Sequence, residues 1–426
     1  MSRFDPKFVK CDTILFMKAS KLLLIMMIAA GSLASPSSPT ATLAQQLAHE
    51  VKVINIEVPV RVFKGSAFID TLSINDFELL DNGKPQTIEA VYLIKKTDIK
   101  REEGKKGAVS PQVSRQFVLF FEMSEYLPEI DRVLDVFFNK VILPGDSLIV
   151  VTPMKRYHMR SESLAKLPKD QIREQLQGKL RQDIFIGTSE YRNTIEELYN
   201  SFSGDASLEE RLEIYSAYLS RLESLRRVNE KGLIQFADYL KTLPGQKFVF
   251  LFYQKENIPT YNPKYLMRQQ FQHQDDPYLT PKFAENFEFF NRDVKFDIQA
   301  VKKAYADSSI SIHFLYVTKT PPLKVPVTAY MSAESAMDGS GEISMVERSE
   351  DIFSAFNEIS QATGGISDTS ANADAAFKRA VDASENYYLI YYTPKDYKPD
   401  GKFHEIKVNI KGGGYRILHR AGYIGN

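Results

Sequence analysis

The first regular pattern in the chain is an alternation of apolar and polar positions. Residues 51–63 read VKVINIEVPVRVF, and this period of two is typical of a strand with one buried face. Short strand-like runs follow, and Asn82-Gly83 between two of them is a strong signal for a β-hairpin. Residues 50–95 are therefore predicted to form an N-terminal β segment.

The pattern changes after a charged stretch. Residues 96–116 contain few apolar side chains and are predicted to be an exposed linker. From there on, continuous apolar runs alternate with segments whose apolar residues recur at helical spacing. The apolar runs are 117–122, 146–153, 247–253 and 310–317. Strands that alternate with helices predict a doubly wound, mainly parallel α/β sheet, in which ligands bind at the carboxyl ends of the strands.

Two stretches interrupt this α/β pattern, which is predicted to extend over residues 117–384. Residues 257–296 are rich in aromatic and polar side chains without a clean period, and are predicted to be an insertion above the strand ends. Such an aromatic insertion is also a candidate protein-binding surface. Residues 320–346 have the composition of a loop. Residues 385–426 return to period-two patterning between glycine-rich turns, which predicts a C-terminal β segment.

Residues 1–44 have the features of an export signal. Lys18 and Lys21 precede an apolar run, Leu22–Ala34, whose length fits a signal sequence and is too short to span a bilayer. Met17 is a candidate start site, because the residues before it are unusually charged for a signal. The alternative is that the apolar run is a membrane anchor. The mature chain is predicted to be exported, to the periplasm or the cell exterior, and to have no membrane span.

The composition narrows the classes of function. The 54 basic and 54 acidic residues give a formal net charge of zero, so bulk electrostatics favour neither nucleic acid nor an anionic membrane as a partner. A single cysteine, Cys11, excludes an intramolecular disulfide and a cysteine-based zinc site. No HExxH, Gly-x-Ser-x-Gly or phosphate-binding glycine-rich motif appears. A hydrolase that uses Ser124 and His158 as nucleophile and base is therefore the weakest hypothesis.

Three stretches of the sequence form a recognisable series. They are VPVRVFKGSAFIDTLSINDFELLDNGKPQTI, then LPGQKFVFLF, and finally ATGG followed by NYYLIYYTP, DGKFHEIKVNIK and HRAGY. Together they resemble the bacterial exported von Willebrand factor type A-related proteins, such as those of Acidobacteria, over nearly the whole mature chain. The resemblance implies a type A α/β domain with a metal-ion-dependent adhesion site on top of its sheet. Because both ends carry the signature, we expect residues 50–95 and 385–426 to pack together as an accessory β domain.

The resemblance assigns the adhesion-site positions to five residues. The family pattern is Asp-x-Ser-x-Ser after the first strand, a threonine in a later loop and an aspartate after a subsequent strand. These side chains supply hard oxygen ligands to Mg²⁺ or Mn²⁺. The corresponding residues here are Glu122, Ser124, Tyr126, Thr188 and Gln254. Glu122 is one methylene longer than aspartate, Tyr126 carries its hydroxyl too far from the backbone, and Gln254 has no charge.

These departures predict a degenerate adhesion site that holds no metal cofactor. Binding of Mg²⁺ or Mn²⁺ is the alternative: an altered site at Glu122, Ser124 and Thr188 would recruit Glu125 or Glu256 as a further ligand. The preferred hypothesis is an exported, non-enzymatic protein-binding or adhesion-type module whose partner is a protein. Metal-dependent adhesion through the altered site is the second hypothesis.

Overall fold

The computed structural model describes most of the chain after residue 53. The described residues are 54–105, 111–200, 207–254, 257–261, 263–272, 274, 278, 296–307, 309–317, 343–347, 350–369 and 372–425. Residues 54–426 form one compact unit. The predicted export signal, including Met17, lies outside the described residues, as do Glu256 and most of the predicted loop at 320–346.

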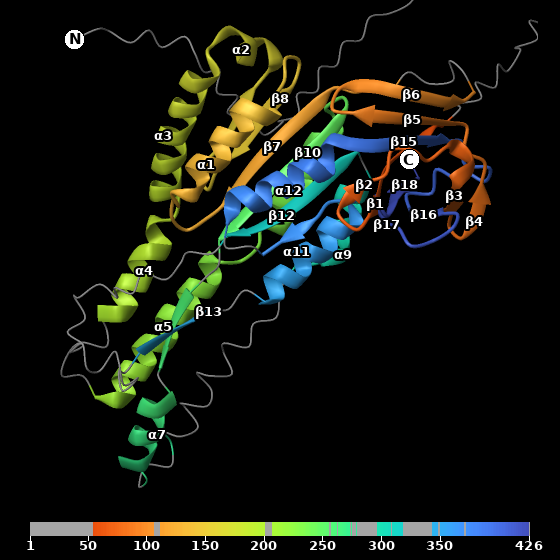
Figure 1. Ribbon diagram of the computed structural model, residues 1–426. Helices are drawn as coiled ribbons and strands as arrows, with labels where there is room; N and C mark the ends of the chain where they lie inside the picture. Colours follow the sequence, from red (N-terminus) through yellow and green to blue (C-terminus); the bar gives the residue numbers. More distant parts are fainter. Residues whose placement is uncertain are drawn as a thin grey trace, which may run out of the picture. The chain divides into compact units, whose positions relative to one another are not determined.

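A six-stranded sheet forms the centre of this unit (Figure 1). Its strands in spatial order are β14 (Ser367–Asp368), β12 (Ile310–Val317), β10 (Gln246–Gln254), β7 (Arg115–Glu122), β8 (Ser147–Val151) and β9 (Arg156–Met159). Neighbouring strands run parallel from β14 to β8, and β9 pairs antiparallel at the edge. The strand order reverses between β7 and β10, so this pair is the switch point of a doubly wound sheet, as the sequence predicted.

Helices cover both faces of the central sheet (Figure 1). They are α1 (Glu129–Val136) with a π-helical continuation (Phe137–Val141), α2 (Ser161–Lys166), α3 (Lys169–Gly187), α6 (Glu230–Lys241), α9 (Ile298–Ala306), α11 (Glu350–Ala362) and α12 (Ala373–Glu385). Two further helices, α4 (Ser189–Asn200) and α5 (Leu208–Leu225), pack on each other beyond the end of the sheet (Figure 1). Phe117 and Leu119 pack with α1, α3 and α12, whereas Val118 packs in a second cluster with α6, α9 and α11. Because successive side chains of a strand point to opposite faces, burial on both faces explains the continuous apolar runs.

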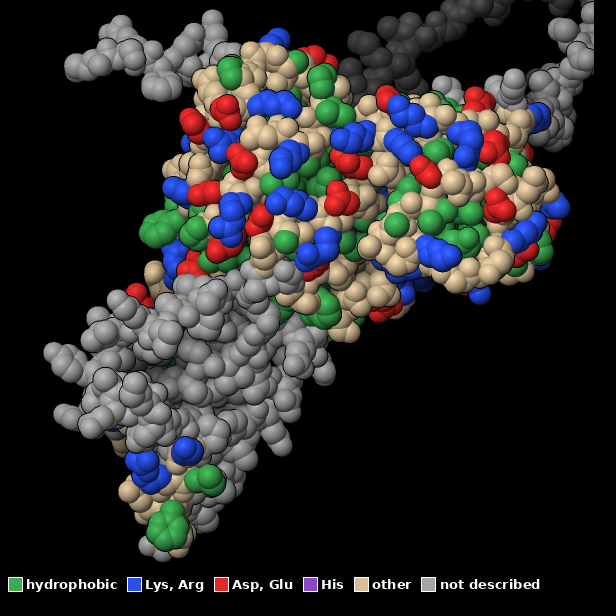
Figure 2. Space-filling model, in the orientation of Figure 1, with side chains coloured by type: hydrophobic (Ala, Val, Ile, Leu, Met, Phe, Trp, Pro, Cys, Tyr) green, Lys and Arg blue, Asp and Glu red, His purple; other side chains and the backbone are tan. Residues whose placement is uncertain are grey.

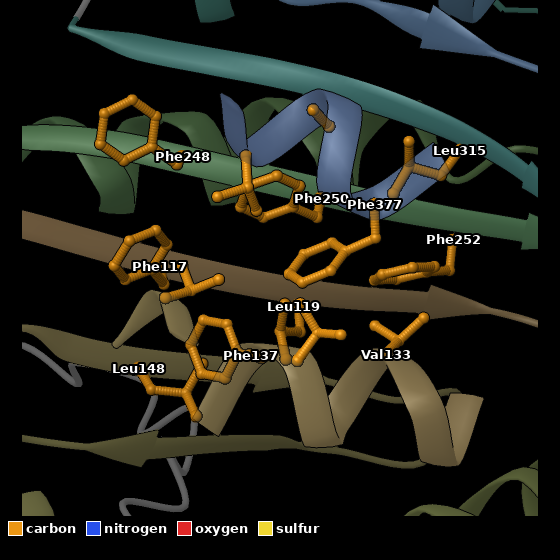
Figure 3. Close-up of a cluster of buried hydrophobic side chains, with 14 of the residues drawn as sticks. Phe117, Leu119, Val133, Phe137, Leu148, Phe248, Phe250, Phe252, Leu315 and Phe377 are labelled. Carbon is orange, nitrogen blue, oxygen red and sulfur yellow. The ribbon is translucent and has the colours of Figure 1, made fainter. Parts of the chain in front are cut away.

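The first of these clusters is unusually aromatic (Figure 3). Phe250 of β10 and Phe377 of α12 meet edge to face with their ring centroids 4.9 Å apart. Phe117 and Phe137 make a similar contact at 5.4 Å, which holds the end of the first helix against β7. These aromatic contacts pack the two switch-point strands, β7 and β10, against helices from distant parts of the sequence, and so hold the two strands in place.

Two further sheets combine strands from both ends of the chain. The larger has the order β17 (Arg416–His419), β1 (Ile56–Lys64), β15 (Asn386–Tyr392), β5 (Ala90–Lys95) and β6 (Asp98–Gly104), with β2 (Ala67–Phe68) paired to β1. The smaller has the order β18 (Gly422–Ile424), β16 (Phe403–Ile410), β3 (Phe77–Asp81) and β4 (Lys84–Gln86), and a single 3₁₀ turn (Ile74–Asp76) precedes β3. The N-terminal and C-terminal segments thus pair directly, strand against strand.

The larger of these sheets lies between two apolar cores. On one face, Tyr92 and Leu389 belong to the cluster that also contains α1 and α12. On the other face, Val60 and Ile390 pack with Val408 of the smaller sheet. The β strands and the α/β layers therefore share a continuous core within the unit formed by residues 54–426.

The predicted linker at residues 96–116 is wrong for most of its described part. Asp98–Gly104 forms strand β6, which pairs antiparallel with β5 at the edge of the sheet. At the other end, Arg115 opens β7 and is buried, and its guanidinium donates to both carboxylate oxygens of Asp146, at 3.0 and 2.6 Å. An exposed edge strand carries charged side chains and is stabilised by backbone hydrogen bonds, so its composition resembles that of a linker.

Both stretches that interrupt the α/β pattern contain regular structure at one end. The predicted insertion, residues 257–296, opens with β11 (Asn257–Tyr261) and α7 (Pro263–Gln272). Strand β11 pairs antiparallel with β13 (Ile343–Glu347), which lies at the end of the loop predicted at 320–346. The two stretches are therefore connected, although they are about eighty residues apart in the sequence.

The described surface carries charges of both signs. Figure 2 shows basic and acidic side chains interspersed over the visible described face, without a field of one sign. In the described ranges, no helix is long and apolar enough to cross a membrane.

Candidate functional site

The strand register brings the loops after β7 and β10 together at the switch point. Tyr253 of β10 lies opposite Glu122 of β7, and both strands end within one residue of this pair. Ser124 follows β7, and Gln254 is the last residue of β10. Three of the predicted site residues therefore meet where a doubly wound sheet binds its ligands.

The side chain of Gln254 joins the two loops. It is 4% exposed, and its Oε1 accepts hydrogen bonds from the backbone N–H groups of Ser124 and Glu125, both at 3.0 Å, and from Ser124 Oγ at 3.2 Å. Its Nε2 donates to Glu125 Oε1 at 3.1 Å. The carboxamide thus makes both an acceptor and a donor contact, which a carboxylate at the same position could not do.

Thr188 also reaches this site. It follows the last residue of α3, and its Oγ1 lies 2.8 Å from the carbonyl oxygen of Ser124 and 2.6 Å from that of Ile184. Arg192 Nη1 donates to the same hydroxyl oxygen at 2.7 Å. The structure therefore brings Thr188 to Ser124 as predicted, but the hydroxyl is engaged by protein groups.

Tyr126 takes part in a separate network. Its hydroxyl donates to Asp131 Oδ1, while Arg181 Nη2 binds Asp131 Oδ2 at 2.9 Å and the guanidinium lies 5.0 Å from the centre of the Tyr126 ring. Burial, reinforced by Asp131, raises the pKa of Tyr126. Its partners among the described residues belong to α1 and α3, so Tyr126 anchors the loop to these helices.

Glu122 differs from the other site residues because its carboxylate makes no hydrogen bond or ion pair with a described residue. Its side chain is exposed. Desolvation by the protein atoms at the end of β7 raises the pKa of Glu122 to about 7.

The residues present do not fit a magnesium or manganese ion. Two backbone N–H donors point at Gln254 Oε1, and such donors repel a cation at the same place. Within the described residues, no group of three or more His, Cys, Asp or Glu side chains is arranged to hold a metal. Glu125, one of the two acids that an altered site would recruit, already accepts from Gln254.

A serine nucleophile is not assembled at this site. Ser124 Oγ donates to Gln254, and no contact joins it to a histidine in the described residues. His158 lies on β9, where its Nδ1 is 3.4 Å from the hydroxyl of Tyr239. Desolvation, followed by Arg160 and Arg156, lowers the pKa of His158.

Beside this site lies an apolar cluster that the sequence analysis missed. Phe185 and Ile186, in the last turn of α3, are 67% and 46% exposed, and Met154 after β8 is 48% exposed. A Cβ placed on Gly187 would lie 3.1 Å from Met154 Cγ, so the three side chains surround the helix end. The sequence could have revealed this cluster. The buried side of α3 is formed by Ile172, Leu176, Leu180 and Ile184, and the apolar residues Phe185 and Ile186 lie outside that helical spacing.

Comparisons of the sequence and the structure with known proteins do not identify a family for this chain. No family model and no curated protein sequence matches the chain. Among solved structures, the human COPII-coat protein Sec24c is similar at 8% identity and a TM-score of 0.25, over 76% of this chain. The chain covers 45% of the length of that protein. The fold class, a mixed α/β architecture with several sheets, therefore rests on the strand order and register described above.

Proposed function

We propose that the protein is an exported, non-enzymatic protein-binding module of von Willebrand factor A-like fold, in which the metal-ion-dependent adhesion site is degenerate. The observation that carries this proposal is the side chain of Gln254. Its carboxamide occupies the position of the second acid in the family pattern and links the two switch-point loops through four hydrogen bonds. The loops are thereby held in place without a cation.

The apolar cluster supports binding of a protein rather than of a small polar ligand. Met154, Phe185 and Ile186 are exposed at the same end of the sheet as Ser124 and Thr188. Exposed aromatic and aliphatic side chains beside a rigid loop are typical of the centre of a protein interface. The export of the chain is proposed from its N-terminal 44 residues, which have the pattern of a signal sequence.

Site-specific photocrosslinking in the producing cell tests this function. A photoreactive phenylalanine analogue replaces Phe185, and the matched control carries it at Ile99, which is 45% exposed on β6. We expect one discrete protein adduct from position 185, unchanged by EDTA, and none from position 99. Loss of the adduct in EDTA would favour metal-dependent adhesion. Absence of any adduct at position 185 would contradict protein binding at this end of the sheet.

A further inference from the structure

Strand β9 forms one edge of the central sheet, and among the described strands it pairs with β8 alone. On its open side, an edge strand presents N–H and C=O groups that can accept a further strand. Arg156 and His158 are exposed, whereas Met159 is half-buried against the cluster that contains α1 and α3. Arg160 continues the extended backbone, with φ −72° and ψ 160°, and is exposed. Alternation therefore places Arg156, His158 and Arg160 on one face of the strand.

Helix α6 supports this basic face of β9. The guanidinium of Arg156 lies 4.2 Å from the ring centre of Tyr239, whose hydroxyl is 3.4 Å from His158 Nδ1. An arginine stacked on a ring keeps its N–H donors available in the guanidinium plane. Neither Arg156 nor Arg160 forms an ion pair with a described residue. Desolvation, Arg160 and Arg156 lower the pKa of His158, and no carboxylate raises it. This face of β9 therefore carries two cations that no described acid neutralises.

The charges of another edge strand are neutralised within the strand itself. On β6, Lys100 pairs with Asp98 at 2.7 Å, and Arg101 pairs with Glu103 at 2.8 Å. The unneutralised cations of β9 also restrict what can pair with it. A second copy of β9 is disfavoured, because like charges opposite each other destabilise a sheet. A strand with acidic residues at alternate positions would instead place a carboxylate opposite each arginine.

We propose that the open edge of β9 binds an extended acidic segment of a protein partner as an additional strand, with carboxylates of that segment on Arg156 and Arg160. Backbone hydrogen bonds would supply affinity, and the alternate carboxylates would supply specificity. The inference goes beyond the proposed function, because it assigns a second surface that requires neither Gln254 nor the apolar cluster of Met154, Phe185 and Ile186.

Fluorescence anisotropy titrations with three labelled synthetic peptides test this surface. The first peptide alternates Glu with Val, the second has Gln in place of every Glu, and the third keeps Glu but has N-methylated backbone amides. The protein is the chain from Gln45 onward, which contains the compact unit of residues 54–426. It is used unchanged and as the double variant Arg156→Gln/Arg160→Gln. The matched control is Arg416→Gln, since Arg416 is an exposed arginine on edge strand β17, 4.6 Å from the ring centre of Phe63.

We expect the first peptide to bind the unchanged protein about fivefold or more tightly than either of the other two. The double variant should lose the preference for Glu over Gln, and Arg416→Gln should retain it. Both proteins should fold, because the replaced side chains are exposed and form no ion pair with a described residue; circular dichroism checks this. The comparison with the N-methylated peptide needs no variant at all.

Equal binding of the Glu and Gln peptides, a preference that survives the double substitution, or no binding of any peptide would overturn the inference. Binding of the N-methylated peptide as tight as that of the first peptide would also overturn it, because charge would then act without an added strand. None of these results affects the crosslink expected at position 185, so failure of this inference is distinguishable from failure of the proposed function.

Discussion

The carboxamide of Gln254 determines which hydrogen bonds hold the loops of the candidate site together. A carboxylate at position 254 could accept hydrogen bonds from the two backbone N–H groups, but it could not donate to Glu125. Gln254 satisfies all three groups at once and is almost completely buried. The sequence identified this position through its resemblance to a family pattern. It could not reveal the four hydrogen bonds, because these depend on the register of two strands that are 130 residues apart.

Removal of this side chain should loosen both loops. In Gln254→Ala, the N–H groups of Ser124 and Glu125 lose their acceptor in a partly buried place, which costs about 1–3 kcal/mol of unfolding free energy. Chemical denaturation followed by circular dichroism measures this loss. Gln171→Ala, on the exposed side of α3, is the control and should change stability by less than about 0.5 kcal/mol. Equal effects of the two substitutions would show that Gln254 does not hold the loops.

A buried histidine should make the protein sensitive to acid. His313 lies in the middle of β12, its Nε2 is 2.8 Å from Ser384 Oγ, and burial together with Arg61 lowers its pKa to about 3. The unfolded chain binds a proton at this residue below its ordinary pKa of about 6.5, whereas the folded chain does not. The contribution of His313 to the free energy of unfolding is therefore fully present above about pH 6.5. It is lost as the pH falls towards 3, by up to about 1.4 kcal/mol per pH unit.

Urea denaturation at pH 7 and at about pH 5.5 measures this effect, in a range where most carboxylates stay ionised. His313→Gln should reduce the difference between the two pH values, although it lowers stability at both. An identical pH dependence in the variant would mean that another group is responsible.

At the scale of elements, hydrophobic patterning predicted those strands and helices that bury apolar faces. β7, β10 and β12 were found because both of their faces are buried in aromatic and aliphatic clusters. β6 was missed because an edge strand needs no apolar face, and its pairing with β5 rests on backbone groups that carry no sequence signal. Residues 226–229 separate the helices α5 and α6.

The glycine pair after α11 shows how tightly the elements are packed. Gly364 has a φ of +70°, and a Cβ on Gly365 would lie 1.7 Å from the carbonyl oxygen of Ile312. Gly365→Ala should therefore force α11 away from β12. We expect it to lower the free energy of unfolding by about 4 kcal/mol or more, as the most severe core substitutions do.

The matched control is Gly178→Ala, in the exposed middle of α3, where a Cβ meets nothing within 4 Å. This change should leave stability unaltered or raise it by up to about 1 kcal/mol, since alanine favours helix over glycine. Thermal melts of both variants give the comparison. A stable Gly365→Ala variant would contradict the close approach of α11 and β12.

At the scale of the whole described unit, the two ends of the chain complete one another. Strand β15 pairs with β1 on one side and β5 on the other, so the larger β sheet cannot form without the C-terminal segment. The sequence predicted that the two segments belong together because they carry parts of one signature. It did not predict that one face of their sheet contributes Tyr92 and Leu389 to the core of the α/β layers.

Truncation after Glu385 tests this dependence. It removes β15 to β18, exposes the apolar faces that these strands cover, and should abolish cooperative unfolding of the remaining chain. Calorimetry should then show no sharp transition, in contrast to the chain from Gln45 to Asn426. A cooperative transition with retained secondary structure in the truncated chain would show that the α/β layers fold independently.

The most direct test of the account is the response of the protein to divalent metal. Thermal melts of the chain from Gln45 onward should coincide in EDTA and in millimolar Mg²⁺, Mn²⁺ or Ca²⁺. A site that is filled at a hundred times its dissociation constant would stabilise the fold by about 2.7 kcal/mol, which a melt detects readily. Coincident melts are the result predicted from the hydrogen bonds of Gln254. A metal-dependent rise in melting temperature that disappears in Glu122→Ala would contradict the degenerate site and establish metal binding through Glu122.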